Sequence, residues 1–140
     1  MGRILAIDYG RKRCGVAVTD PLQLIAGDSK TIATHELMQF LQDYTAREAV
    51  DRIVVGLPKQ LNGQPSESMR YITPFLNRLR KVMPAMPVEM YDERFTSTIA
   101  HQAMIAGGMK KSDRRDKSRV DSIAATIILT DYLESKKTII

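Results

Sequence analysis

The chain has 140 residues, a net charge of +5, 44% hydrophobic residues and 26% charged residues, which is the balance of a soluble globular protein. No apolar run approaches the roughly 20 residues needed to cross a bilayer, and the short apolar run near the N-terminus lacks the pattern of a signal peptide. A single cysteine, Cys14, excludes an internal disulfide. We therefore expect a cytoplasmic protein without membrane attachment, folded as one domain over residues 1–140.

The N-terminal segment is predicted to form strands. Residues 3–8 are apolar up to Asp8 and show no helical stripe, which indicates a buried strand. Residues 15–19 predict a second strand, and the short turn between the two, which contains Gly10, predicts an antiparallel hairpin. A third short strand is expected near residues 30–32.

After residue 34, helical patterns alternate with short apolar strands. The predicted helices cover residues 34–49, 66–83, 96–106 and 118–134, and the predicted strands cover residues 52–57 and 88–91. Thr34 is expected to cap the first helix. The apolar face of the last helix is expected to comprise Val120, Ile123, Ala124, Ile127 and Ile128. This order predicts an α/β fold in which a mixed sheet begins with an antiparallel hairpin, continues with parallel strands and carries helices on both faces.

Four acidic residues lie at the ends of these predicted elements. Asp8 ends the first strand, Asp92 and Glu93 follow a later strand, and Asp121 lies in the first turn of the last helix. Sites in open α/β sheets form beyond the carboxyl ends of the strands. Carboxylates gathered there repel one another unless a cation joins them, and Mg²⁺ or Mn²⁺ prefers such oxygen ligands. A pair of these ions about 4 Å apart can activate water for phosphodiester cleavage.

Each acid also has a purely structural interpretation. Asp8 can bond its own backbone in a turn, Asp92 can start a turn, and Glu93 can pair with a neighbouring arginine. Asp121, three residues after Ser118, resembles the acid of a capping box. Taken singly, each acid is more often structural than catalytic. Only their common location makes metal binding a serious alternative to the structural interpretation.

Two basic segments are candidates for phosphate contacts. Arg11, Lys12 and Arg13 occupy the turn after Asp8. Residues 109–120 hold six basic residues against two acidic ones, a net charge of +4, and the basic ones are Lys110, Lys111, Arg114, Arg115, Lys117 and Arg119. Their charge fits a solvated loop and a phosphate-binding loop equally well.

Four motifs in chain order resemble the YqgF/RuvX family. The first is residues 8–20, Asp-Tyr-Gly-Arg-Lys-Arg-Cys-Gly-Val-Ala-Val-Thr-Asp. The second is Val-Val-Gly-Leu-Pro at residues 54–58, followed by Asn62-Gly63, and the third is Asp-Glu-Arg-Phe-Thr-Ser at residues 92–97. The last runs from Lys117 through Asp121 to Ile128-Leu129, so the resemblance spans nearly the whole chain.

The resemblance implies a ribonuclease H-like fold and a cytoplasmic phosphodiesterase that uses divalent metal. Its substrate would be the 5′ end of pre-16S rRNA or, alternatively, a Holliday junction, that is, branched DNA. The resemblance carries the roles of metal ligand and catalytic acid to Asp8 and Asp121, with Glu93 as the middle acid and Asp92 as second choice. A junction resolvase needs two sites and hence a homodimer, whereas a monomer suffices for RNA trimming.

Two other functions fit parts of the sequence. A non-catalytic RNA- or DNA-binding module would use the same basic surfaces and would bind without metal-dependent cleavage. A nucleotide-binding fragment of the actin-like kinase fold also starts with an apolar strand and Asp-x-Gly, but that architecture needs a second lobe to close on ATP.

Overall fold

The computed structural model describes residues 2–57, 69–92 and 117–137, in which five strands form one mixed sheet. The strands are β1 (Arg3–Asp8), β2 (Arg13–Thr19), β3 (Ala26–Ala33), β4 (Val50–Leu57) and β5 (Val88–Asp92). The helices are a 3₁₀ turn, η1 (Thr34–Glu36), and the α-helices α1 (Leu37–Arg47), α2 (Met69–Val82) and α5 (Lys117–Lys137). The predicted helix over residues 96–106 lies outside the described residues.

The order of strands in the sheet is β3-β2-β1-β4-β5. β1 pairs antiparallel with β2, and β2 with β3, whereas β4 pairs parallel with both β1 and β5. The parallel pairs are the ones whose connections include a helix, because a parallel connection must cross from one end of the sheet to the other. The predicted mixed sheet is therefore confirmed.

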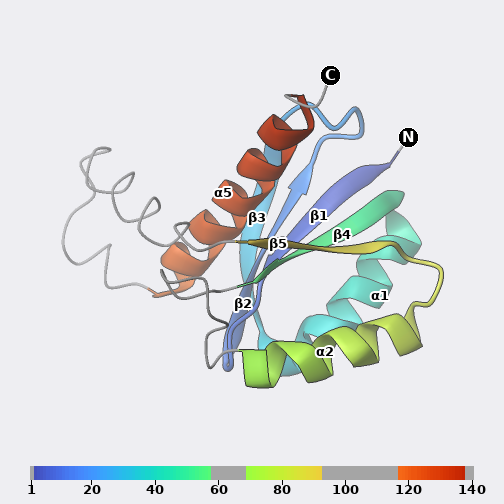
Figure 1. Ribbon diagram of the computed structural model, residues 1–140, viewed down its shortest axis with the longest axis vertical. Coiled ribbons are helices and arrows are strands. Elements are labelled where there is room, and N and C mark those ends of the chain that lie inside the picture. The colour runs from blue at the N-terminus through green and yellow to red at the C-terminus, as the bar shows by residue number, and fades with distance from the viewer. Residues whose placement is uncertain (1, 58–68, 93–116, 138–140) are drawn as a thin grey trace.

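Helices cover both faces of this sheet (Figure 1). Strand alternation in β1 sends Leu5 and Ile7 into a core with α1 and α2, and sends Ile4 and Ala6 into a second core with α5. All four side chains are buried, which explains why the sequence of this strand is continuously apolar rather than alternating. Among the described residues, no helix is long and apolar enough to span a membrane.

A polar network joins the C-terminal half of α5 to β4 and β5. Arg52 Nη1 of β4 lies 2.9 Å from Glu89 Oε1 of β5 and donates to the Tyr132 hydroxyl of α5 at 2.9 Å. That hydroxyl donates in turn to Glu89 Oε2 at 2.7 Å. The bond from Tyr132, together with the nearby Glu89 charge, raises the pKa of Arg52, so the guanidinium stays charged. The network holds the C-terminal half of α5 at the amino-terminal ends of β4 and β5, and α5 begins at the opposite, carboxyl edge of the parallel strands (Figure 1).

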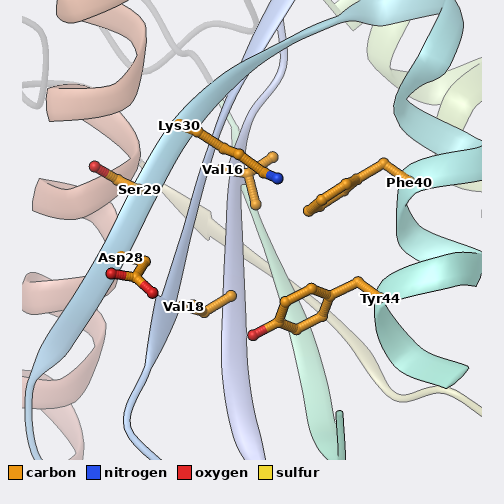
Figure 2. A pocket seen from close by; sticks show the side chains of 7 residues that line it. All are labelled: Val16, Val18, Asp28, Ser29, Lys30, Phe40 and Tyr44. Atoms are coloured by element: carbon orange, nitrogen blue, oxygen red, sulfur yellow. The ribbon is translucent and has the colours of Figure 1, made fainter. Parts of the chain in front are cut away.

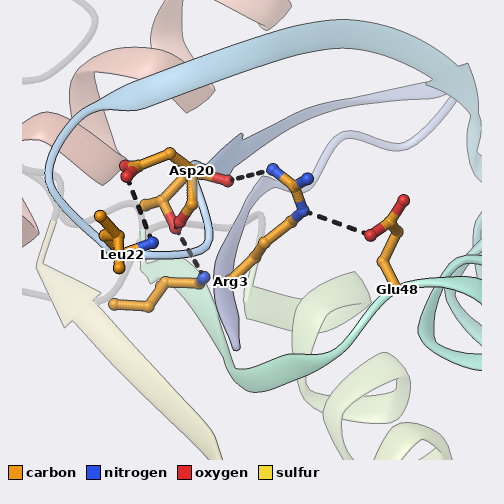
Figure 3. A network of polar contacts seen from close by, with 6 residues as sticks. Arg3, Asp20, Leu22 and Glu48 are labelled. Carbon is orange, nitrogen blue, oxygen red and sulfur yellow. Dashed lines mark hydrogen bonds and ion pairs between the residues drawn. The ribbon is translucent and has the colours of Figure 1, made fainter. Parts of the chain in front are cut away.

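The turn between β2 and β3 is fixed by Asp20. Its carboxylate accepts the backbone N–H groups of Leu22, Leu24 and Ile25 at 2.8–3.2 Å. Nearby, Arg3 donates to the Thr19 carbonyl at 2.9 Å and pairs with Glu48 at 3.6 Å (Figure 3). The bonds from the turn, that of Ile25 foremost, lower the pKa of Asp20.

Three details differ from the sequence predictions. β3 covers Ala26–Ala33 rather than residues 30–32, because its pairing along β2 recruits exposed polar residues that carry no apolar pattern. Thr34 caps no helix; its hydroxyl instead donates to the Gly10 carbonyl at 2.7 Å.

The third difference is the buried face of α5. Ala124 and Ile128 are buried as predicted, but Ile123 and Ile127 are only half-buried, and the side chain of Val120 is not among those described. The face includes instead Ala125, Leu129, Tyr132 and Leu133. A small side chain explains the shift, because Ala125 lets the helix approach the sheet at Ala6 and Ala17.

Candidate metal and phosphate site

The carboxyl ends of the three parallel strands meet at one edge of the sheet. Ile7 of β1 pairs with Val55 of β4, and Leu57 of β4 pairs with Asp92 of β5. Asp8 and Asp92 therefore end the strands on either side of β4, and two strand spacings place their backbones roughly 10 Å apart. Ligands of open α/β sheets bind at such an edge.

Asp8 stands in a gap between two glycines. It follows Ile4 and Ala6 on the face covered by α5, and it is partly exposed. Its partner on β2 is Gly15, and on β4 Gly56 follows Val55, the partner of Ile7. Both glycines are buried, and neither carries a side chain, so no side chain from the paired positions of β2 and β4 flanks the Asp8 carboxylate.

For two of the other predicted acids, Asp92 and Asp121, the structure describes the backbone alone. The backbone of Asp121 lies in the first turns of α5, one helical turn before the buried Ala124 and Ala125, and therefore at the same end of the sheet as Asp8. The backbone of Asp92 ends β5. Glu93 lies outside the described residues. Among the side chains that the structure describes, no three metal-ligating groups form a cluster, and Asp8 is the predicted ligand whose surroundings are known.

The basic turn after Asp8 is anchored to the rest of the protein. Arg11 and Lys12 are exposed, and Arg13 begins β2. Gly10 is required in this turn, because a Cβ at that position would lie 2.2 Å from the Arg13 carbonyl oxygen. On the side of α2, the Tyr9 ring packs against Phe75 with 4.7 Å between centroids, and the Arg11 guanidinium lies 4.8 Å from the centroid of Tyr71.

Two groups lie under the turn, the partly buried phenol of Tyr9 and the buried thiol of Cys14. Burial, followed by the neighbouring Cys14, raises the pKa of Tyr9 against the opposing charge of Arg78, so its phenol is neutral near pH 7. Cys14 is fully buried and donates weakly to the Gly10 carbonyl at 3.7 Å. It therefore fills space and supports the turn.

Of the second basic segment, Lys110, Lys111, Arg114 and Arg115 lie outside the described residues. Lys117 and Arg119 belong to the first turn of α5, whose backbone starts at the carboxyl edge of the sheet. Arg11 to Arg13 thus follow Asp8 directly, and Lys117 and Arg119 belong to a helix that begins at the same edge of the sheet.

A separate pocket of about 320 Å³ lies on the opposite face of the sheet (Figure 2). Val16 and Val18 form its floor, Phe40 and Tyr44 of α1 form a wall, and Asp28, Ser29 and Lys30 form its rim. Lys30 Nζ lies 4.5 Å from the centroid of Phe40. Because Asp8 belongs to the α5 face, this pocket is not part of its site.

A partly exposed carboxylate that is flanked by two glycines and followed by an anchored basic turn suits the chemistry of phosphate esters. The family model described as "RuvX: Holliday junction resolvase" matches residues 2–135. The chain belongs to the RuvX family. This is a family of nucleases, and the chain is accordingly a nuclease.

Its relatives are similar over their whole length. A protein of Phocaeicola vulgatus named "Putative pre-16S rRNA nuclease" is 62% identical over 139 residues, which cover 99% of this chain and 100% of the relative. A protein of Bacteroides thetaiotaomicron with the same name is 57% identical over 137 residues, covering 98% and 99%.

Solved structures agree with the predicted fold. T. thermophilus RuvC in complex with a Holliday junction substrate aligns with a TM-score of 0.57 at 15% identity, over 98% of this chain and 96% of that chain. A further T. thermophilus RuvC structure aligns with a TM-score of 0.51 at 13% identity, over 97% and 96%. At such identities the likeness shows the fold alone, which confirms the ribonuclease H-like prediction for this RuvX-family chain.

Proposed function

We propose that this chain is a divalent-metal-dependent nuclease that processes the 5′ end of pre-16S rRNA in the cytoplasm, as one domain, for which a monomer suffices. The observation that carries the proposal is the position of Asp8, between two glycines at the carboxyl edge of the sheet and directly before an anchored basic turn. The names of relatives 57–62% identical support RNA as the substrate class.

The residues at this edge fit Mg²⁺ or Mn²⁺. Both ions take oxygen ligands and keep positions for water and phosphate, and Asp8 is a partly exposed carboxylate flanked by glycines rather than by larger side chains. Asp8 would hold the metal, with Asp121 from the start of α5 as a second ligand. When bound, the metal would supply an activated water and stabilise the charge that develops on the phosphate.

Glu93 is proposed as the middle acid, with Asp92 as second choice. Alternate residues of a strand lie on the same face, and Tyr91 of β5 packs against the core on the α5 face, the face of Asp8. If that alternation continues past the end of β5, it favours Glu93. Comparing Glu93→Gln with Asp92→Asn tests the choice, because the ligand variant should need far more Mn²⁺ for half-maximal cleavage.

Phosphate binding is assigned to two basic segments. Arg11, Lys12 and Arg13 would contact the backbone of the substrate beside the scissile bond, and the segment with Lys110, Lys111, Arg114, Arg115, Lys117 and Arg119 would extend the contact. Binding of this kind releases counterions, so the affinity should fall steeply as the salt concentration rises.

The test compares wild type with Asp8→Asn on an end-labelled RNA that carries the 5′ region of pre-16S rRNA. We expect wild type to cleave in Mg²⁺ or Mn²⁺ and Asp8→Asn to bind the RNA but not cleave it, because the amide is a poor metal ligand. Asp43→Asn is the matched control, since Asp43 is an exposed carboxylate on α1 that accepts a bond from Gln39. Cleavage by Asp8→Asn at the wild-type rate would contradict the assignment.

Resolution of Holliday junctions is the second candidate function, favoured by the description of the family model and by the RuvC-like fold. It predicts a homodimer that cuts a four-way DNA junction symmetrically. The same experiment with a labelled junction decides between the two, and binding of both substrates without any cleavage would favour a non-catalytic binding module.

A further inference from the structure

The turn that carries Arg11 is held from two sides by residues far away in the sequence. Thr34 lies at the start of η1 and Tyr71 lies in the first turn of α2. We propose that Thr34 and Tyr71 are positioning residues, which fix the backbone and the guanidinium of Arg11 so that it receives a phosphate of the nucleic acid. The inference rests on the proposed function, because it takes the basic turn to be a phosphate-binding element.

Thr34 fixes the backbone on both sides of Arg11. Its hydroxyl donates to the Gly10 carbonyl at 2.7 Å, and its own N–H donates to the Lys12 carbonyl at 3.0 Å. The buried Cys14 thiol, 3.4 Å from the Thr34 hydroxyl, supports the first of these bonds. Residues 10 and 12 are thus tied to one residue of another element, and the intervening Arg11 has little backbone freedom.

Tyr71 fixes the side chain. The guanidinium of Arg11 lies over the Tyr71 ring, with its central carbon 4.8 Å from the ring centroid, and this cation–π contact restrains the side chain. The guanidinium carries five N–H donors in one plane. Two of those donors match two phosphate oxygens, which is the strongest geometry for this recognition. Both side chains are exposed, so the pair is accessible to a ligand.

Helix α2 also holds Tyr9, two residues before Arg11. Tyr9 packs on Phe75, one helical turn after Tyr71. Because Tyr9 and Arg11 both rest on α2, the turn cannot rotate without breaking two ring contacts. An arginine held in this way loses less conformational entropy when it binds phosphate than a free surface arginine does.

The test measures RNA affinity in the Asp8→Asn background, where binding is separated from cleavage, using the labelled pre-16S RNA. We expect Tyr71→Leu to weaken binding roughly threefold to tenfold, and Tyr71→Phe, which keeps the ring, to retain the affinity. Thr34→Val should weaken binding and Thr34→Ser should restore it. Tyr44→Leu is the matched control, because Tyr44 also lies beside an arginine, Arg47, at 6.0 Å, but on α1 away from the turn.

A double-mutant cycle separates positioning from direct contact. If Tyr71 acts through Arg11, then Tyr71→Leu should have no further effect once Arg11 is alanine. Arg11→Ala itself should reduce the slope of log affinity against log salt concentration by about one, the amount expected for one phosphate contact. Equal losses from Tyr71→Leu with and without Arg11, or unchanged affinity in Tyr71→Leu and Thr34→Val, would overturn the inference.

The two proposals fail in different ways. If wild type cleaves no RNA with any divalent metal while the cycle is non-additive, the proposed nuclease function on this substrate is wrong and the positioning roles stand. If wild type cleaves and the cycle is additive, the positioning roles are wrong. Thermal unfolding of each variant confirms that the compared proteins are folded.

Discussion

Tyr132→Phe isolates the contribution of one hydroxyl group to the attachment of α5. The Tyr132 ring is buried and meets Tyr91 edge-on, with 6.3 Å between centroids, and phenylalanine keeps that packing. The substitution removes only the oxygen that accepts from Arg52 and donates to Glu89. The direct ion pair between Arg52 and Glu89 remains.

The expected loss follows from the partial exposure of this network. Hydrogen bonds to charged groups contribute about 1.5–3 kcal/mol each when they are buried. Here the side chains of Arg52 and Glu89 are 32% and 40% exposed, so water replaces part of what is lost. We therefore expect the free energy of unfolding to fall by about 1–2 kcal/mol, or roughly 3–8 °C in Tm for a domain of this size.

Urea unfolding followed by circular dichroism measures this difference. The matched control is Thr130→Val, which removes from the same helix an exposed hydroxyl bonded to its own backbone, and which should change stability by less than about 0.5 kcal/mol. Equal losses in the two variants, or a loss below about 0.3 kcal/mol in Tyr132→Phe, would refute the reasoning that this hydroxyl joins α5 to the sheet.

Two further predictions concern the site and the β2–β3 turn. Gly15→Ala should lower the cleavage rate at least about tenfold, because its methyl group would lie directly beside Asp8. Gly27→Ala on β3, whose Cβ would lie 3.3 Å from the Val18 carbonyl oxygen of β2 and away from Asp8, should cleave normally. A Gly15→Ala variant that is folded and fully active would contradict the role of this glycine. Because the pKa of Asp20 is lowered from its ordinary value of 3.8, its charge stabilises the fold above that pH, and the stabilisation is lost as the pH falls through the lower pKa of the folded state. Asp20→Asn should accordingly be less stable than wild type at pH 7, and the gap should narrow below about pH 4 in denaturation curves; a gap that stays constant from pH 7 to pH 3 would contradict the charge effect.

The two parallel strands β1 and β4 could be predicted closely because burial imposes a composition on them. A strand covered on both faces has apolar residues at consecutive positions, and residues 4–7 and 53–55 show this pattern without any knowledge of their neighbours. β3 is the opposite case. It lies at the edge of the sheet, half of its residues are exposed and none is buried, and only its hydrogen bonds with β2 make it a strand.

The candidate site was predictable in part for the same reason. Asp8 could be identified because a charged residue that ends a buried strand is conspicuous, and the basic residues after it are visible in the sequence. The glycines beside it were not identified, because Gly15 and Gly56 become its neighbours only through the pairing of β1 with β2 and β4.

Thr34 marks the boundary between local and tertiary information. Its residue type and its place before a helical pattern favour a helix cap, since a cap needs only adjacent residues. The folded chain instead brings the Gly10 and Lys12 carbonyls to it. The sequence by itself therefore determined the elements, the strand-end aspartate and the family, because these depend on composition and order along the chain. The tertiary structure alone decided what surrounds Asp8 and what holds Arg11, because those contacts join residues that are 7 to 60 positions apart.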